Sequence, residues 1–201
     1  MLHYERKRNR LWNFDYDSNG CYFITICTKD RKNYFGEIIG KKINLSEIGL
    51  NAKKFWKEIP NHFTEAKLDA FVIMPNHIHG IIKIKRIVKN INKIVGVADL
   101  RPLQKQNNHN LHTQIIKTNL SKIDPELARF IGIDRSKMII PKIIHGYKSS
   151  VSRILNIKNI EFAWQRSYFD KFIKNEKMYQ NIIYYIQHNV DNWENDEFNK
   201  D

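Results

Sequence analysis

The chain has 201 residues and an ordinary hydrophobic content of 42%, which suffices for one substantial core and excludes a wholly disordered protein. Lysine and arginine total 34 against 21 acidic residues, a net charge of +13. That excess predicts an anionic partner, nucleic acid before an anionic membrane. No apolar run approaches the roughly 18 residues of a membrane span, so we expect no membrane insertion.

The first half of the chain predicts strands followed by a helix. Residues 21–28 are rich in β-branched and aromatic side chains, which are typical of a strand. Two more strand candidates begin at Tyr34 and cover residues 41–45. Ser46 suits a helix N-cap, the apolar residues after it follow helical spacing, and we expect Pro60 to stop this helix.

A histidine pair lies directly after a turn between two predicted strands, 68–74 and 77–85. Pro75-Asn76 suits the turn of a hairpin. Because side chains alternate along a strand, the imidazoles of His77 and His79 leave the same face of the sheet. Two neutral imidazoles on one face can hold one divalent metal and leave positions for substrate or water.

Residues 86–140 predict a polar, basic insertion, with one short helix capped by Asp124. Residues 141–155 then carry an apolar helical face, with Lys148 and Arg153 lying off it. Strands covered by helices on one face fit an α+β sandwich. We therefore expect residues 1–201 to form a single domain that carries this insertion.

The last predicted helix begins after Asn175, a suitable N-cap, and runs to about Trp193. Tyr184 falls on its solvent side, whereas Tyr185 falls on the flank of the apolar stripe, in line with Asn189 one turn later. A tyrosine in that position is either a core-edge residue with a wet hydroxyl or a functional group beside the sheet. Spacing alone favours the first of these.

The two cysteines, Cys21 and Cys27, lie on one predicted strand. An extended chain separates residues six apart by roughly 20 Å, which is too far for a disulfide. We expect both thiols to be reduced, as in an intracellular protein.

Four blocks of sequence together resemble the REP-associated tyrosine transposases, members of the single-tyrosine HUH transposase superfamily. The Met74-Pro-Asn-His-Ile-His79 block is specific together with Trp164-Gln165 and with the Tyr-Ile-x-x-Asn motif of residues 185–189. The blocks occur in the family's order over about residues 20–195, and they cover residues 22–31, 71–82, 164–170 and 185–189. The family usually has proline after the asparagine, whereas this chain has Val190, which would let the helix continue.

The resemblance implies a ferredoxin-like (RRM-like) antiparallel sheet with helices packed mainly on one face. It also implies a transposase that cleaves and rejoins single-stranded DNA, often at hairpin ends, through a 5′-phosphotyrosine intermediate. Tyr185 matches the nucleophile, His77 and His79 match the metal-binding histidines, and Asn189 matches the third ligand. A monomer or homodimer in the cytoplasm, associated with the nucleoid, is expected.

For the metal we expect Mg²⁺, with Mn²⁺ able to substitute because it accepts imidazole more readily. Zinc is the competing interpretation, but the sequence offers no cysteine or carboxylate to complete a typical zinc site. Basic side chains could grip the phosphates of a DNA hairpin. The candidates are Arg6, Lys7, Arg8, Arg10, Lys148 and Arg153.

Two other functions remain open. A catalytically inactive or host-domesticated nucleic-acid-binding protein would bind DNA or RNA without cleaving it. A metal-dependent hydrolase would release a free 5′-phosphate and form no covalent adduct. Trp164, Tyr168 and Phe169 could stack on bases, but core positions are at least as common for such residues.

Overall fold

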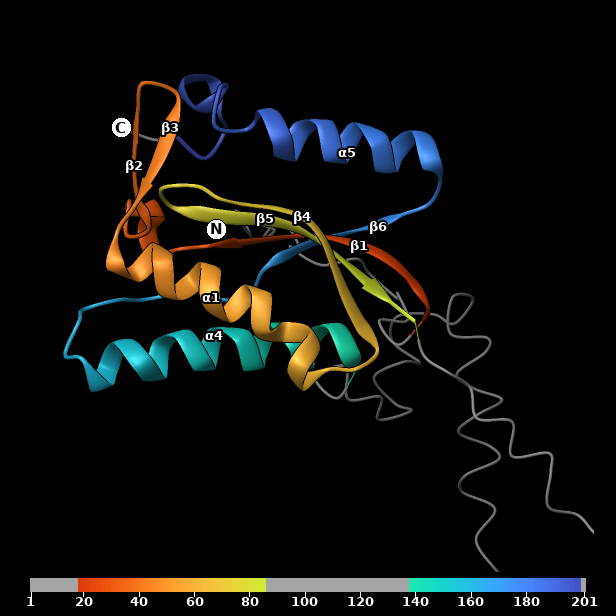
Figure 1. The fold of residues 1–201 in the computed structure, drawn as a ribbon, viewed down its shortest axis with the longest axis horizontal. Helices are drawn as coiled ribbons and strands as arrows, with labels where there is room; N and C mark the ends of the chain where they lie inside the picture. The colour runs from red at the N-terminus through yellow and green to blue at the C-terminus, as the bar shows by residue number, and fades with distance from the viewer. Residues whose placement is uncertain (1–17, 86–137, 200–201) are drawn as a thin grey trace, which may run out of the picture.

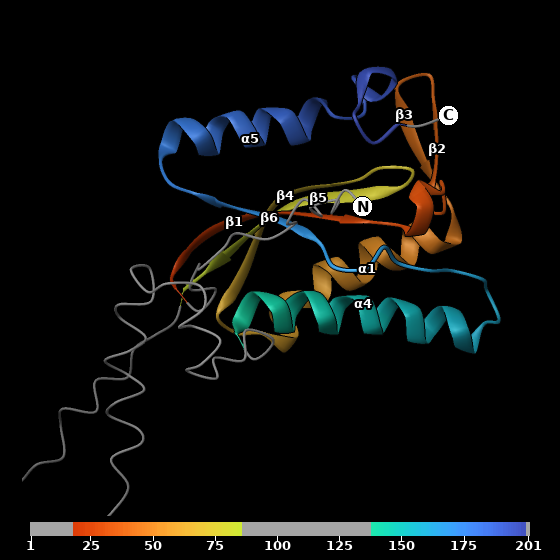
Figure 2. The same ribbon diagram turned by 180° about the vertical axis from the view of Figure 1, so that it is seen from behind.

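The computed structural model describes residues 18–85 and 138–199. Its centre is a four-stranded antiparallel sheet in the order β4-β5-β1-β6. Helices α1 and α4 cover one face of the sheet and α5 lies across the other (Figures 1 and 2). The predicted α+β fold, an antiparallel sheet with helices mainly on one face, is therefore confirmed. The larger elements are β1 (Gly20–Cys27), α1 (Glu47–His62), β4 (Ala66–Ile73), β5 (His77–Ile84), α4 (Ile139–Ile157), β6 (Phe169–Ile173) and α5 (Glu176–His188).

A small second sheet joins β2 (Gly36–Ile39) to β3 (Lys42–Leu45) ahead of α1. Ser46 caps α1 as predicted, since its hydroxyl accepts from the Gly49 N–H at 3.1 Å. Two short 3₁₀ turns, η1 (Lys29–Arg31) and η4 (Trp193–Asn195), complete the described elements. The predicted helix near Asp124, most of the insertion, and Arg6, Lys7, Arg8 and Arg10 lie outside the described residues.

The main hydrophobic core fills the space between the sheet and the pair α1 and α4. Trp56 of α1 is fully buried and comes so close to β5 that a Cβ on Gly80 would lie 2.4 Å from its ring. Glycine at this position is therefore what lets α1 pack directly behind the strand of the histidines. Tyr147 of α4 donates to the Ala52 carbonyl of α1 at 3.1 Å and joins the two helices.

Three local predictions were wrong. Pro60 lies inside α1, which ends only at His62. In the last turn of a helix a proline removes one hydrogen bond, but the residues after it can still adopt helical conformation. The last helix ends at His188 rather than near Trp193, because the chain turns back across the sheet. Strand β6 was missed, since its five residues lack a clear alternating pattern.

The predicted hairpin and the core position of Tyr168 were confirmed. The hairpin of β4 and β5 places His77 at the first position after the turn. Both cysteines are free, and Tyr168 lies in the core with 4% of its surface exposed. Within the described residues no helix is long and apolar enough to cross a membrane.

Candidate active site

The histidine pair lies in the middle of the sheet, on the face that α5 covers. Strand β5 is hydrogen-bonded on both sides, and His77 and His79 are almost completely buried. Their ring centroids are 4.4 Å apart, as expected for side chains two residues apart on one strand. On β1, Thr25 is the cross-strand partner of His79 and Cys27 that of His77.

Asn76 determines which nitrogen of His77 carries the proton. The Asn76 amide donates through Nδ2 to two backbone carbonyls, of Arg31 at 3.1 Å and of Phe198 at 2.8 Å. Its Oδ1 is therefore an acceptor, and His77 Nδ1 donates to it at 2.8 Å. The lone pair of His77 is consequently on Nε2, which is buried and has no hydrogen-bond partner among the described residues.

His79 connects the sheet to the last helix. Its Nδ1 lies 2.8 Å from Thr25 Oγ1, and its Nε2 lies 3.0 Å from the hydroxyl of Tyr185. If Nδ1–H donates to the threonine, Nε2 carries the lone pair and accepts from the tyrosine. In that tautomer both histidines present an Nε2 lone pair on the same side of the sheet.

Tyr185 reaches the pair from the flank of α5. It is 39% exposed, against 64% for Tyr184 next to it, so the flank position expected from helical spacing is confirmed. Asn189, one turn later, is 1% exposed and lies beside His77. The structure thus brings together four residues singled out from the sequence: His77, His79, Tyr185 and Asn189.

The segment after α5 contributes a carboxylate that sequence reasoning missed. Potential ligand atoms of Asp196, His77 and His79 all lie within 4.8 Å of one another. Asp196 Oδ2 accepts from Asn189 Nδ2 at 3.0 Å, and its Oδ1 accepts from the Phe198 N–H at 2.7 Å. The sequence expectation that no carboxylate joins the histidines was therefore wrong, and it no longer counts against zinc, which two histidines and a carboxylate can bind. Asp196 belongs to a short acidic stretch without periodicity, so the sequence does not indicate that it lies beside the histidines. Its position depends on the chain turning back after α5.

Burial controls the protonation of these groups. Loss of water, reinforced by the positive charge of Arg31, lowers the pKa of His79 to about 3. Burial, and then the neighbouring His79, holds the pKa of His77 well below its ordinary value. Both imidazoles are therefore neutral at pH 7 and suited to bind a metal. Burial and the charge of Asp196 raise the pKa of Tyr185 to about 12, which keeps the phenol protonated.

A pocket of about 890 Å³ opens over Tyr185 and His79. Aromatic rings form part of its wall: Phe198 lies 4.7 Å from the ring of His77, and Phe23 is stacked on His79 at 5.2 Å. The remaining lining combines amides and both signs of charge. These residues include Thr25, Arg31, Asp170, Lys171, Asn189, Asn192, Asn195, Asp196 and Glu197.

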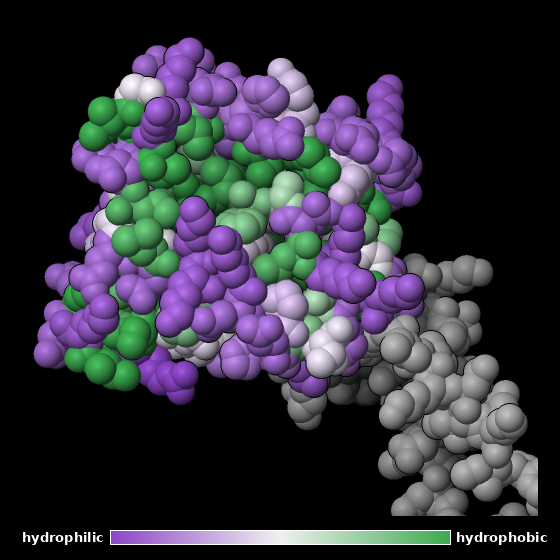
Figure 3. All heavy atoms as spheres, in the orientation of Figure 1, coloured by the Kyte–Doolittle hydropathy of each residue, from purple (hydrophilic) through white to green (hydrophobic). Residues whose placement is uncertain are grey.

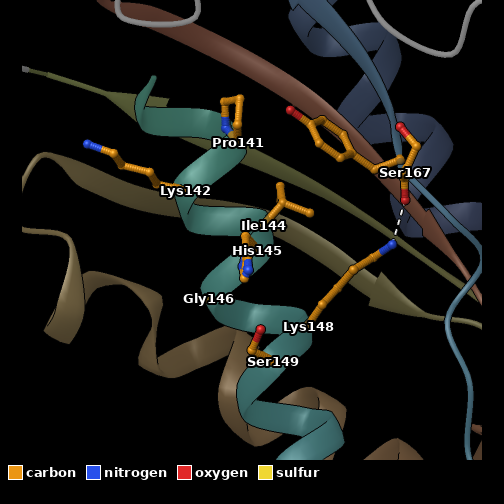
Figure 4. Close-up of a pocket in the computed structure, with 9 residues that line it drawn as sticks. Pro141, Lys142, Ile144, His145, Gly146, Lys148, Ser149 and Ser167 are labelled. Carbon is orange, nitrogen blue, oxygen red and sulfur yellow. Dashed lines mark hydrogen bonds between the residues drawn. The ribbon is translucent and has the colours of Figure 1, made fainter. Parts of the chain in front are cut away.

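The two predicted DNA contacts Lys148 and Arg153 are on α4, which lies on the opposite face of the sheet from α5 (Figure 1). Lys148 donates to the Gln165 carbonyl at 2.8 Å and to that of Ser167, so its ammonium links α4 to the chain that enters β6. It also lines a separate hollow of about 750 Å³ with Lys142 and His145, as Figure 4 shows. Arg153 is exposed further along α4. Their DNA-binding role stays a prediction.

No protein-family model matches the chain. A solved structure of a REP-associated tyrosine transposase bound to a REP hairpin aligns with a TM-score of 0.49 and 13% identity, covering 94% of this chain and 72% of that one. An uncharacterized protein of Haemophilus influenzae is 35% identical over 196 residues, which are 96% of this chain and 93% of the relative. That identity over nearly the whole length of both proteins shows common descent. The chain belongs to the same family as this Haemophilus influenzae protein.

Proposed function

We propose that the protein is a metal-dependent single-stranded DNA endonuclease and strand transferase that acts through a 5′-phosphotyrosine intermediate on Tyr185. The observation that carries this proposal is the 3.0 Å approach of the Tyr185 hydroxyl to His79 Nε2, beside His77 and Asp196. The four sequence blocks that resemble REP-associated tyrosine transposases support it. The substrate would be single-stranded DNA with a hairpin, in keeping with the charge of +13.

The residues present fit a divalent metal ion. Two neutral imidazoles and a carboxylate converge, and two buried atoms, His77 Nε2 and Asn189 Oδ1, lack a hydrogen-bond partner among the described residues. Buried polar atoms of this kind are normally satisfied, and a cation would satisfy both. When bound, the ion would polarise the scissile phosphate and offset the charge that builds on its oxygens. The mixed nitrogen and oxygen set suits Mn²⁺ as well as Mg²⁺.

The proposed reaction conserves protons. The Tyr185 oxygen attacks phosphorus, the bond from phosphorus to the 3′-oxygen breaks, and the proton lost by the phenol ends on the released 3′-hydroxyl. Because a phenoxide is a competent leaving group, the 3′-hydroxyl can reverse the step and reseal the strand. The half-exposed position of Tyr185 at the pocket mouth leaves its oxygen accessible to a DNA strand.

One observation favours a non-cleaving nucleic-acid-binding protein as the second candidate. The pKa of Tyr185 is raised to about 12 by burial and then by the charge of Asp196, so without a cation the phenol is a poor nucleophile. A cation bound by Asp196 would offset the negative charge of this carboxylate and so lower the pKa of Tyr185. The two candidate functions therefore differ in whether metal activates covalent chemistry.

Labelled single-stranded hairpins from the DNA flanking the gene test the proposal, incubated with Mg²⁺ or Mn²⁺ and resolved on a denaturing gel. We expect a metal-dependent covalent adduct that Tyr185→Phe abolishes and that His77→Ala and His79→Ala reduce at least 100-fold. Tyr184→Phe is the matched control and retains the adduct, because Tyr184 points to solvent. Equal adduct from wild type and Tyr185→Phe would disprove the nucleophile, and cleavage without adduct would indicate a hydrolase.

A further inference from the structure

Arg31 lies in a turn beside the candidate active site and has no role in the reaction proposed above. It is the last residue of η1, directly after β1, and its side chain lines the same pocket as His79 and Tyr185. The guanidinium lies over the ring of Phe198, 4.0 Å from its centroid. Arg31 therefore lies against the same segment that supplies Asp196.

The backbone that presents Arg31 is unusual. Asp30 and Arg31 have φ values of 54° and 58°, so two successive non-glycine residues adopt the left-handed conformation. Such a conformation is unfavourable and persists only where surrounding contacts impose it. Here the Arg31 carbonyl accepts from Asn76, the residue that orients His77, so the turn and the metal-binding strand are held together.

One nitrogen of the guanidinium, Nη1, is buried without a hydrogen-bond partner in the described part of the chain. A buried N–H group without an acceptor is costly, and a charged one more so. Packing against Phe198 stabilises the face of the guanidinium, and the side chain also forms a hydrogen bond with Cys27, but neither gives Nη1 an acceptor. An oxygen-rich anion in the pocket would satisfy them.

The lining of the pocket carries both signs of charge, so an anionic ligand needs a cation there to hold it. Three carboxylates line it, on Asp170, Asp196 and Glu197, and they would repel an entering phosphate. Arg31 and Lys171 are the cations among its lining residues.

We propose that Arg31 binds the scissile phosphate, holding its non-bridging oxygens between the guanidinium and the site formed by His77, His79 and Asp196. This inference rests on the proposed function, because it names the group that binds the DNA phosphate in that site. A guanidinium presents paired donors that match two phosphate oxygens, and it stays charged at every working pH. Arg31 would both position the phosphate in line with Tyr185 and offset charge in the transition state.

The test is a double-mutant cycle between Arg31 and the charge of single phosphates. The probe is the single-stranded hairpin oligonucleotide, with one methylphosphonate placed in turn at each linkage near the cleavage position; each replacement removes one negative charge. Binding is measured with Mn²⁺ in a Tyr185→Phe background, where cleavage does not interfere, for Arg31 and Arg31→Met. Arg166→Met is the matched control, since Arg166 is exposed and lies outside the pocket lining.

We expect one methylphosphonate position to weaken binding at least tenfold with Arg31 present and to have little effect in Arg31→Met, so that the two changes are not additive. With Tyr185 intact, Arg31→Met should slow adduct formation by about 100- to 1,000-fold, with partial recovery in Arg31→Lys. Arg166→Met should behave as wild type in both assays.

Additive losses at every position would overturn the inference, even if wild type forms the adduct, because Arg31 would then act only by supporting the turn and Phe198. Coupling at one position without any adduct would instead uphold phosphate binding by Arg31 and overturn the proposed cleavage. Thermal unfolding of Arg31→Lys and Arg31→Met is recorded beside both assays. Equal melting temperatures together with non-additive binding exclude a folding defect as the cause.

Discussion

The chemistry of the pocket depends on which nitrogen lone pairs are available. The lone pair of His77 is on Nε2 because Asn76 engages Nδ1, and this buried atom has no hydrogen-bond partner among the described residues. His79 Nε2 instead faces the Tyr185 hydroxyl. An imidazole nitrogen has one lone pair, so His79 can accept from the phenol or bind a cation through Nε2, but not both. Metal binding should therefore release the Tyr185 hydroxyl towards the substrate.

This competition predicts that Tyr185→Phe binds Mn²⁺ more tightly than wild type. Loss of one hydrogen bond, about 0.5–1.5 kcal/mol, would correspond to an increase in affinity of roughly 2- to 10-fold. Isothermal titration of the DNA-free protein measures it, with Tyr184→Phe as the unchanged control. Weaker binding by Tyr185→Phe would mean that the phenol is itself a ligand.

A second prediction concerns the carboxylate of Asp196. Its carboxylate lies with the two histidines, whereas Glu197 lines the same pocket without belonging to that cluster. Asp196→Asn should weaken Mn²⁺ binding by about 10- to 100-fold, since it removes the anionic oxygen, and Glu197→Gln should change it less than threefold. Equal effects from the two variants would leave Asn189, rather than Asp196, as the candidate third ligand.

Among the secondary-structure elements, α5 is held on the sheet by a polar anchor far from the histidines. An irregularity in the pairing of β4 and β5, between Leu68 and Phe71, redirects the strand at Asp69. Asp69 accepts from Tyr179 of α5 and from Lys83 of β5, and Lys83 also donates to the Tyr179 hydroxyl at 2.9 Å. Tyr179 lies on the same helix as Tyr185, so this anchor helps to hold α5, and with it Tyr185, against the sheet.

The anchor predicts a pH dependence of stability. Partial burial alone would raise the pKa of Asp69, but hydrogen bonds from Lys83 and Tyr179 outweigh it and hold the pKa below its ordinary value. A depressed carboxyl pKa contributes stability above the unfolded pKa of about 3.9, and the contribution is lost as pH falls through the folded pKa.

Asp69→Asn should therefore lower the melting temperature at pH 7 by roughly 2–4 °C, equivalent to about 1 kcal/mol, and the difference from wild type should shrink towards pH 3. Melting curves followed by circular dichroism from pH 7 to pH 3 measure it. Glu65→Gln is the control, because Glu65 directly precedes β4 and makes none of the anchor's hydrogen bonds. A difference that stays constant with pH would contradict the assignment.

At the scale of the whole molecule, the sheet separates two hydrophobic clusters of unequal size. The large one joins the sheet to α1 and α4, with Trp56, Tyr147 and Leu155 at its centre. The cluster under α5 has only Ile81, Ile173 and Ile186 fully buried among the described residues. Apolar side chains remain visible where α5 meets the sheet (Figure 3). The helix that carries Tyr185 is thus the least deeply packed of the three described helices.

Native-state hydrogen exchange should reflect this difference. Amides of α5 should exchange through a local opening of lower free energy than amides of α1 and α4, whose protection should approach that of global unfolding. Exchange measured by mass spectrometry on peptides from each helix gives the comparison. Addition of Mn²⁺ should slow exchange in the segment around Asp196 more than in α4. Equal protection of all three helices would contradict the two-cluster description.

Local patterns were sufficient to predict much of the fold. The β-branched and aromatic content of β1, the hairpin of β4 and β5, and the Ser46 cap depend on neighbours along the chain, so they were visible in the sequence. The end of α5 and strand β6 depend on partners distant in sequence, and both were misjudged. The effect of Pro60 was also misjudged. A proline stops a helix or is tolerated in it according to its distance from the helix end, and tertiary contacts help to set that end.

The sequence by itself determined that His77 and His79 share a face and that Tyr185 and Asn189 share a side of one helix, because strand and helix periodicity are properties of the backbone. Only the tertiary structure decided that these two faces meet, with the Tyr185 hydroxyl 3.0 Å from His79. It alone also brought in Asp196 and Arg31. Their side chains reach the pocket through a reversal of the chain and a strained turn, and neither has a periodicity that a sequence can display.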